Sequence, residues 1–258
     1  MSWRSRRQGA YLGVFVLLVV LVVFIIVYPI LFKAPTCTDK KQNGFETGVD
    51  CGGQCQLYCP KTVALPRVEW ASVFYVSEDV YNVVAMLTST APSAGARNAS
   101  YTFTLYDEAG KVIKEVKGST FIPPASSFAV FEPQIRTGQR TPTRVRFVWD
   151  DNQIYFEKTK FNSNSLPIDV SLWKRDTVLD TERLTVNISN NSLRSIEESD
   201  YIVVVYDEND EPIAASKTRS ALGARSDQVL FFSWPYQFKK DPKRYELVKR
   251  INPFTYVQ

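Results

Sequence analysis

The residues best suited to chemistry are four cysteines that lie within one short segment. Cys37, Cys51, Cys55 and Cys59 are all the cysteines of the 258-residue chain, and they are spaced C-x13-C-x3-C-x3-C. Clustered thiols bind zinc or an iron–sulfur cluster in reducing compartments and form disulfides in oxidising ones. The chemistry of the segment therefore depends on the compartment in which it lies.

An apolar stretch directly before the cysteines bears on that compartment. No charged residue lies between Arg7 and Lys33, and residues 12–32 consist almost entirely of Val, Leu, Ile and Phe. A helix of this length spans about 32 Å, close to the hydrocarbon thickness of a bilayer. A cleaved signal peptide would have a shorter apolar core and small residues at its cleavage site. We therefore predict a single transmembrane helix over residues 11–32.

Cationic residues predict the orientation of this helix. Arg4, Arg6 and Arg7 precede the apolar stretch, and cationic flanks remain in the cytoplasm. We expect residues 1–10 to be a cytoplasmic stub in the cytoplasmic membrane and all later residues to be extracytoplasmic. An oxidising exterior favours disulfides over a metal site, and four cysteines allow three pairings that the sequence does not rank.

The segment between the first two cysteines partly fits a calcium-binding loop. Counted from Asp39, the residues Asn43, Gly44 and Asp50 fall at tolerable positions, but Lys41 stands third, where a carboxylate belongs. The alternative is a turn-rich loop in which Gly44 and Gly52-Gly53 supply positive φ angles. We favour the loop, leave calcium binding open and expect neither a cofactor nor a resident metal.

The string ETGVDCGG, Glu46 to Gly53, is the most specific part of the segment. It resembles a Cys-rich motif of envelope proteins in candidate-phylum bacteria and some archaea. The resemblance implies an exported juxtamembrane stalk, here residues 33–62, and no activity.

Beyond the cysteines the chain repeats itself. YTFTLYDEAGKVI begins at Tyr101 and YIVVVYDENDEPI begins at Tyr201, and the offset of 100 also relates Phe131 to Phe231 and Arg144 to Arg244. Two domains of ordinary size follow, over residues 63–158 and 167–258. The linker between them, residues 159–166, is short, so we expect the domains to sit end to end.

Apolar and polar residues alternate within both domains. Tyr101, Phe103 and Leu105 alternate with threonines, and RVRFVW and LTVNIS follow the same period of two. YIVVV is apolar on both faces, so it is a central strand or covers another surface. Turn residues separate these segments. We predict an all-β fold of two tandem immunoglobulin-like antiparallel β-sandwiches behind one N-terminal transmembrane helix.

The string Phe103-Thr104-Leu105-Tyr106-Asp107 resembles the FxLYD domain, a β-sandwich of exported and membrane-tethered bacterial and archaeal proteins. The second copy keeps only Tyr206 and Asp207 of this pattern. The resemblance implies the fold and an extracytoplasmic location, and it brings no catalytic residues. We expect the tyrosine to pack at a strand end and the aspartate to accept hydrogen bonds from turn amides.

Several residues that enzymes need are missing from the sequence. The chain has no histidine, which excludes His-based general base catalysis and His-ligated zinc. Phosphate-binding glycine loops and the G-x-S-x-G elbow are absent as well. Neighbouring carboxylates such as Asp107-Glu108 lie at predicted turns, where they are usually solvated. We expect a protein that is not an enzyme.

Basic residues cluster at the same repeat position in both copies. The eight cations are Arg136, Arg140, Arg144 and Arg146 in the first copy and Lys239, Lys240, Lys243 and Arg244 in the second. An anionic partner such as an envelope polymer would fit them. The simpler interpretation, which the sequence favours, is charge that keeps strand edges from pairing between molecules. Aromatic residues are not interleaved in the first loop, so we expect no nucleic acid.

Two functional hypotheses are compatible with these features. The first is a non-catalytic, membrane-anchored envelope protein that presents two sandwiches for binding or scaffolding to a protein or an anionic envelope polymer. The second is an accessory subunit of an export or surface-filament assembly.

Overall fold

The computed structural model describes residues 3–31, 34–150, 154–160, 166 and 168–255. These fall into two compact units, residues 1–55 and residues 56–258. Most of the linker predicted over 159–166 lies outside the described residues.

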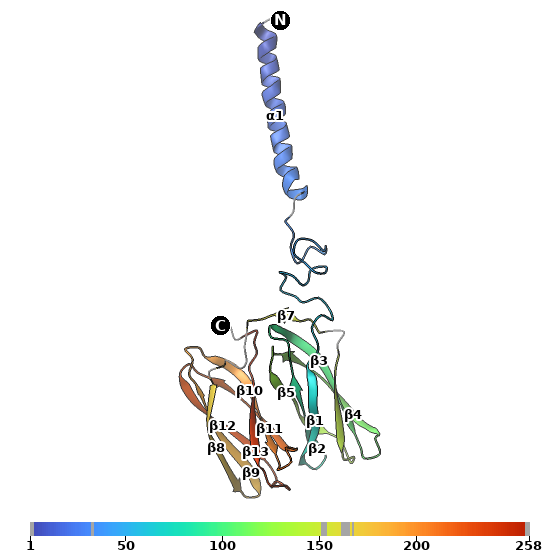
Figure 1. The fold of residues 1–258 in the computed structure, drawn as a ribbon, viewed down its shortest axis with the longest axis vertical. Helices are drawn as coiled ribbons and strands as arrows, with labels where there is room; N and C mark the ends of the chain where they lie inside the picture. Colours follow the sequence, from blue (N-terminus) through green and yellow to red (C-terminus); the bar gives the residue numbers. More distant parts are fainter. Residues whose placement is uncertain (1–2, 32–33, 151–153, 161–165, 167, 256–258) are drawn as a thin grey trace. The chain divides into compact units, whose positions relative to one another are not determined.

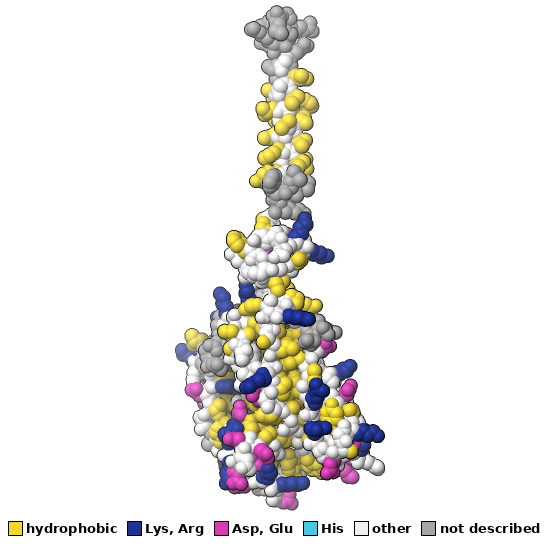
Figure 2. Space-filling view, turned by 45° about the vertical axis from the view of Figure 1, so that its right-hand side comes forward, with side chains coloured by type: hydrophobic (Ala, Val, Ile, Leu, Met, Phe, Trp, Pro, Cys, Tyr) yellow, Lys and Arg dark blue, Asp and Glu magenta, His cyan; other side chains and the backbone are white. Residues whose placement is uncertain are grey.

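The first unit begins with helix α1, Trp3–Leu31. Its segment Tyr11–Tyr28 has a mean hydropathy of 3.1, and none of that segment is buried against protein. Figure 2 shows the hydrophobic side chains that cover the helix. A continuous apolar surface of this length matches a bilayer core. The single apolar helix predicted near the N-terminus is confirmed.

The second unit is built from strands. In chain order they are β1 (Arg67–Ser77), β2 (Val80–Thr88), β3 (Ala94–Tyr106), β4 (Val112–Ile122), β5 (Ser127–Arg136), β6 (Arg144–Trp149), β7 (Glu157–Lys158), β8 (Ile168–Val178), β9 (Thr181–Asn190), β10 (Ile196–Tyr206), β11 (Pro212–Leu222), β12 (Ser226–Trp234) and β13 (Arg244–Arg250).

These strands form four antiparallel sheets, which pack as two sandwiches (Figure 1). Sandwich 1 consists of the sheets β1-β2-β5 and β4-β3-β6, with the short β7 paired to β3. Sandwich 2 consists of β8-β9-β12 and β11-β10-β13, so its strands follow the same order as their counterparts in sandwich 1. The predicted all-β fold with one helix is confirmed.

Alternating side chains fill the core of each sandwich. Tyr101, Phe103 and Leu105 of β3 are buried with Val145, Phe147 and Trp149 of β6 in core 1. Leu184, Val186 and Ile188 of β9 occupy core 2. The period of two read from the sequence therefore identified the inward faces of these strands correctly.

A third apolar cluster lies between the two sandwiches. From sandwich 1 it contains Phe74, Val84, Met86, Ala129 and Phe131, and from sandwich 2 it contains Ile202, Val204, Tyr206, Ala215 and Val248. The outer face of sheet β1-β2-β5 thus packs on the outer face of sheet β11-β10-β13. The expected end-to-end arrangement is wrong, because it would have left both apolar faces in water.

Strand β10 explains why the sandwiches meet at this face. It is the central strand of its sheet, and Val203 and Val205 point into core 2 while Ile202 and Val204 point to the other sandwich. Both alternatives offered for the apolar YIVVV string are therefore realised in one strand. The counterpart strand β3 carries Thr102 and Thr104 at the corresponding positions, and these face outward.

A buried arginine also joins the two sandwiches. The Nη2 group of Arg250, on β13, donates to Thr120 Oγ1 at 2.7 Å and to the Phe121 carbonyl at 2.8 Å. Its guanidinium lies over the rings of Phe121 and Phe128, 4.0 and 4.8 Å from their centroids. Burial lowers the pKa of Arg250, but an arginine stays protonated in proteins. The cation is therefore held by carbonyl, hydroxyl and ring contacts.

One hydrogen bond in core 1 has no counterpart in core 2. Tyr101 Oη donates to Glu132 Oε1 at 2.6 Å, and Gly118 leaves room for it, since a Cβ there would lie 2.5 Å from the tyrosine oxygen. In sandwich 2 the equivalent of Glu132 is Phe232, and the buried Tyr201 Oη has no partner among the described residues.

This difference predicts unequal effects of the same substitution. Tyr101→Phe removes a hydrogen bond to a carboxylate and should lower the free energy of unfolding by about 1–3 kcal/mol. Tyr201→Phe removes an unpaired buried hydroxyl and should leave stability unchanged or raise it. Urea unfolding of both variants tests this, and an equal loss of stability in the two would contradict the assignment.

Candidate functional site

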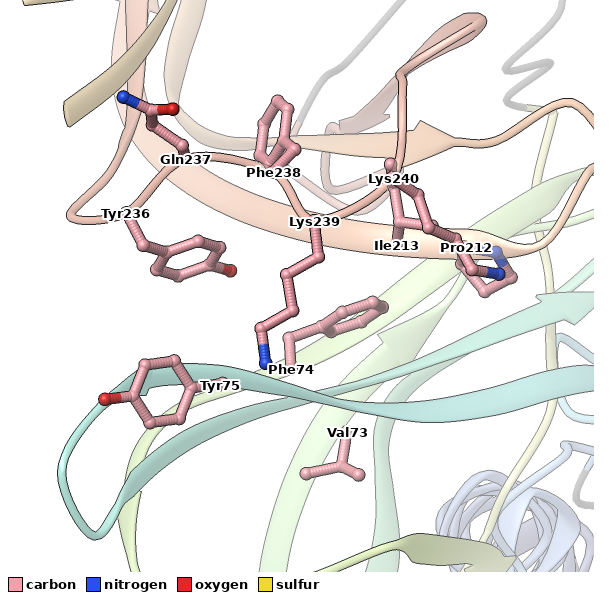
Figure 3. Close-up of a pocket in the computed structure, with 10 residues that line it drawn as sticks. All are labelled: Val73, Phe74, Tyr75, Pro212, Ile213, Tyr236, Gln237, Phe238, Lys239 and Lys240. Carbon is pink, nitrogen blue, oxygen red and sulfur yellow. The ribbon is translucent and has the colours of Figure 1, made fainter. Parts of the chain in front are cut away.

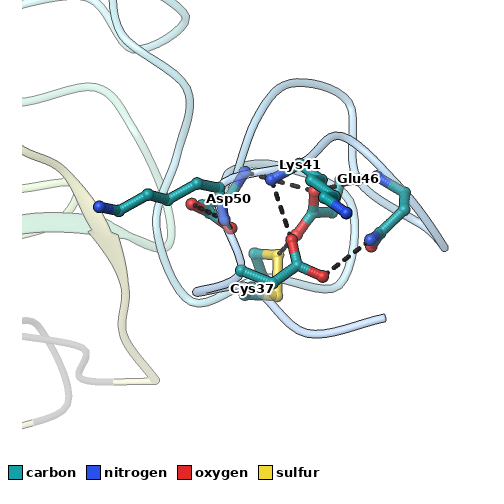
Figure 4. Close-up of a disulfide and its surroundings, with 8 residues drawn as sticks. Cys37, Lys41, Glu46 and Asp50 are labelled. Carbon is teal, nitrogen blue, oxygen red and sulfur yellow. Dashed lines mark hydrogen bonds between the residues drawn. A yellow bond between two sulfur atoms is a disulfide. The ribbon is translucent and has the colours of Figure 1, made fainter. Parts of the chain in front are cut away.

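The cysteine segment is cross-linked as predicted. Cys37 and Cys55 form a disulfide with their Cα atoms 5.6 Å apart, and Figure 4 shows it inside the folded loop. Cys51 and Cys59 are also disulfide-bonded, so no described cysteine is free. Of the three pairings that the spacing allows, the structure therefore selects the one that contains Cys37–Cys55. Thiols in disulfides are not available as metal ligands.

Carboxylates of the same loop bind its own backbone. Asp50 accepts from the Lys40 amide at 2.9 Å, and Asp39 accepts from the Lys41 amide at 2.9 Å. Glu46 accepts from the amides of Asn43 and Asp50, both at 3.3 Å. These oxygens stabilise turns instead of converging on one point, which favours the turn-rich loop over a calcium site.

Positive φ angles in this loop fall where the sequence predicted them. Gly44, Gly52 and Gly53 have φ values of 58°, 71° and 53°. A Cβ at Gly53 would lie 1.6 Å from the Phe45 carbonyl oxygen, so this position requires glycine.

The Tyr-Asp pairs at the ends of β3 and β10 have the structural role expected for them. Asp107 Oδ1 accepts from the Lys111 amide at 2.8 Å, and Asp207 Oδ1 accepts from the amides of Asn209 and Glu211, both at 3.0 Å. Each tyrosine lies under an arginine. The Cζ atom of Arg144 is 5.3 Å from the Tyr106 ring centroid, and that of Arg244 is 3.7 Å from the Tyr206 centroid.

The four arginines predicted as anion contacts in sandwich 1 are all exposed. Arg140 donates to the carbonyls of Val112 and Ile113 at 3.2 and 3.0 Å, and Arg144 stacks on Tyr106. None of the four forms an ion pair with an acid among the residues that the structure describes. We call Arg136, Arg140, Arg144 and Arg146 the arginine cluster.

The cations of sandwich 2 are placed differently. Lys240 pairs with Asp207 at 2.6 Å and with Glu211 at 3.0 Å, and Lys243 pairs with Asp241 at 2.8 Å. Arg244 pairs with Asp210 and Glu246, at 3.0 and 3.2 Å. The ion pair with Lys240 holds the pKa of Asp207 below its ordinary value. Only Lys239 of this group lacks an acidic partner in the described part of the chain.

Substitutions between the copies account for the contrast. Five acids pair with these sandwich 2 cations. Asp207 is kept in sandwich 1 as Asp107, but the other four, Asp210, Glu211, Asp241 and Glu246, are replaced by Gly110, Lys111, Thr141 and Arg146. The loops occupy equivalent positions in the two sandwiches, but the loop of sandwich 1 has fewer acidic neighbours for its cations. The eight residues therefore separate into one unneutralised cluster and one set that is largely ion-paired.

A pocket of about 350 Å³ lies beside the remaining cation. Its floor and walls come from Val73, Phe74 and Tyr75 of β1, from Pro212 and Ile213 of β11, and from residues 236–240 of the β12–β13 loop. Figure 3 shows the Tyr75 ring on β1 next to the Tyr236 ring on the loop, with the Lys239 side chain extending from the loop toward β1. The pocket thus lies where the two sandwiches meet.

Three contacts fix the loop that carries half of this pocket. Gln237 Nε2 donates to Asp180 Oδ1 at 2.8 Å, Lys240 is held by its two carboxylates, and the Phe238 ring packs edge-on against Trp234 at 5.1 Å. The loop is preorganised, so a ligand would not have to order it.

Sequence reasoning identified Lys239 and Lys240 but not the aromatic residues beside them. The string Trp234-Pro-Tyr236-Gln-Phe238-Lys239-Lys240 interleaves aromatic rings with cations, and this signal was available. Tyr75 lies far away in sequence, and only the packing of the two sandwiches brings it to the pocket.

Alkylation of the cysteines distinguishes a disulfide-bonded stalk from one that is held by a metal ion. Without reductant, an alkylating reagent should modify no cysteine in the folded protein, and after reduction it should modify all four, as measured by intact mass. A strong chelator should change neither result, because the loop is held by cross-links and its own carboxylates. Alkylation of unreduced protein, or exposure of thiols by the chelator alone, would contradict this account.

Comparisons with known proteins leave the chain without an assigned family. No protein-family profile and no curated protein matches it. Among solved structures, a red sea bream transglutaminase aligns with 73% of this chain and 30% of its own length, at 9% identity and a TM-score of 0.25. An exo-chitosanase from Amycolatopsis orientalis aligns with 66% of this chain and 25% of its own, at 9% identity and a TM-score of 0.18. The chain therefore spans less than a third of either protein, and likenesses this low support no inference about activity.

Proposed function

We propose that this chain is a non-catalytic, single-pass membrane protein that presents its two sandwiches outside the cytoplasmic membrane and binds an anionic envelope polymer. The apolar helix and the disulfide-bonded segment after it support this location. Arginines before the helix support a cytoplasmic N-terminus. We infer further that the sandwiches are two copies of one FxLYD-like domain, on the strength of the offset of 100 and the matching strand orders.

The arginine cluster is the observation that supports binding. Arg144 and Arg146 lie on the edge strand β6, where charge alone would protect against edge-to-edge pairing. The counterpart loop of sandwich 2 has a similar number of cations and neutralises most of them with acids. Protection of a strand edge needs only cations, and nearby acids would not interfere with it. Binding of an anionic partner, in contrast, is favoured by the absence of acids at the four positions, because neighbouring carboxylates would repel the partner and compete for the arginines.

Binding to an anionic polymer that lacks carboxylates tests this function. The full chain in detergent micelles should bind dextran sulfate at about 50 mM salt and should weaken as salt is raised, because bound counterions are released. Replacing Arg136, Arg140 and Arg144 by alanine should weaken binding by about tenfold or more. The matched control replaces Lys174, Arg183 and Arg225, three exposed cations outside the eight, by alanine, which removes the same number of charges from sandwich 2.

The two triple variants distinguish a site from general charge. Binding that survives in the control but not in the arginine variant, with both proteins folded by circular dichroism, supports the proposal. Equal loss in both variants, or no salt-sensitive binding by the parent chain, would overturn it.

A further inference from the structure

The pocket between the sandwiches combines ring faces with one unpaired cation. The rings of Tyr75 and Tyr236 lie 5.8 Å apart at 56°, and those of Tyr236 and Phe238 lie 6.4 Å apart at 74°. Tyr75 also meets Tyr81 edge-on at 5.9 Å, and it is still 50% exposed, so part of its ring is accessible to a ligand. Val73, Phe74 and Ile213 supply the rest of the apolar lining. Most ligand sites share this composition of apolar walls and few polar groups.

The polar groups of the pocket are placed at its rim. The Lys239 ammonium extends into the space between loop and β1 (Figure 3) and has no acidic partner among the described residues. Burial raises the pKa of Tyr236 to about 12, so its hydroxyl remains a hydrogen-bond donor at neutral pH. The pocket therefore offers a cation and phenolic hydroxyls around an aromatic centre.

This arrangement suits one class of ligand better than others. A sugar ring is apolar on its faces and carries hydroxyl groups around its edge, so it can stack on tyrosine while its edge meets polar groups. A carboxylate on that ring would pair with Lys239. An acidic peptide side chain is polar only at its tip and would leave most of the ring surface uncovered.

The pocket also lies close to Arg136, one member of the arginine cluster. Tyr75 pairs with Tyr81 of β2, and Tyr81 pairs with Ile135 of β5, the residue before Arg136. Two strand spacings amount to about 10 Å. A polymer held by the arginine cluster is thus within reach of the pocket.

We propose that this pocket is a subsite for a carboxylated sugar ring within an anionic polysaccharide, with Tyr75 and Tyr236 stacking on the ring and Lys239 pairing with its carboxylate. The proposal rests on the proposed function and adds the chemical class of the partner. The arginine cluster supplies attraction to any polyanion, and the pocket supplies selection for uronate units.

Short uronate oligomers test the pocket directly. Isothermal titration of the full chain in micelles with oligomers of galacturonate, glucuronate and mannuronate should detect binding of at least one. Tyr75→Ala and Lys239→Met should each raise its dissociation constant by about tenfold or more. Tyr155→Ala and Lys174→Met, which alter an exposed tyrosine and an exposed lysine elsewhere, should leave it unchanged. Carboxyl-reduced oligomers should bind the parent chain about as weakly as the Lys239→Met variant binds the acid form.

The possible outcomes distinguish failure of the uronate subsite from failure of the proposed function, which is binding of an anionic polymer. Dextran sulfate binding that depends on the arginine cluster, without pocket-dependent binding of any uronate oligomer, would overturn the sugar subsite and leave the proposed function standing. Pocket-dependent binding of an acidic peptide in place of the sugars would also overturn it. Loss of both dextran sulfate and uronate binding in the parent chain would overturn the two proposals together.

Discussion

Packing between the outer faces of two sheets is the interaction on which the second unit depends. Sheet β1-β2-β5 and sheet β11-β10-β13 each bury one face in their own sandwich and the other face against each other. Val204, a member of this contact, is fully buried although its side chain points out of its own sandwich. A sheet that is apolar on both faces must be covered on both, because exposed apolar area is costly in water. This contact fixes Tyr75 opposite the β12–β13 loop and so creates the pocket.

The two sandwiches have the same strand order but carry different residues on their outer surfaces. Outward positions that hold Ile202 and Val204 in β10 hold Thr102 and Thr104 in β3, so sandwich 1 presents a polar sheet where sandwich 2 presents its docking face. Four of the five acids that neutralise the cations at the β12–β13 loop of sandwich 2 are absent from sandwich 1, and only Asp207 has a counterpart there, Asp107. The stacked tyrosine and arginine at the strand ends persist in both. The inner framework is thus shared, and the chemistry differs at the surface.

Much of this architecture could be predicted from local sequence pattern. The apolar helix, the alternating strands, the turn glycines and the amide-binding role of Asp107 and Asp207 each depend on neighbours in the chain, and periodicity or turn chemistry reveals them. The string YIVVV, which is apolar on both faces, even indicated that the outer face of its sheet could be covered. Sequence did not identify which face would cover it, because Phe74, Met86 and Phe131 come from three separate strands. The role of Tyr75 in the pocket could not be predicted for the same reason, since its neighbours there are distant in the sequence. The ion pairs of Lys240 and Arg244 could not be predicted either, because the fold brings the acids Asp207 and Asp210 close to them.

The fixed relation between the sandwiches can be measured by pulsed electron paramagnetic resonance. Glu115 and Lys174 are exposed residues on the two outermost sheets, and no described native cysteine is free to react. Spin labels on Glu115→Cys and Lys174→Cys should therefore report one narrow distance distribution, which Val204→Asp should broaden by placing a charge in the contact. A broad distribution in the parent chain, or one that Val204→Asp leaves unaltered, would show that the sandwiches are not held by these faces.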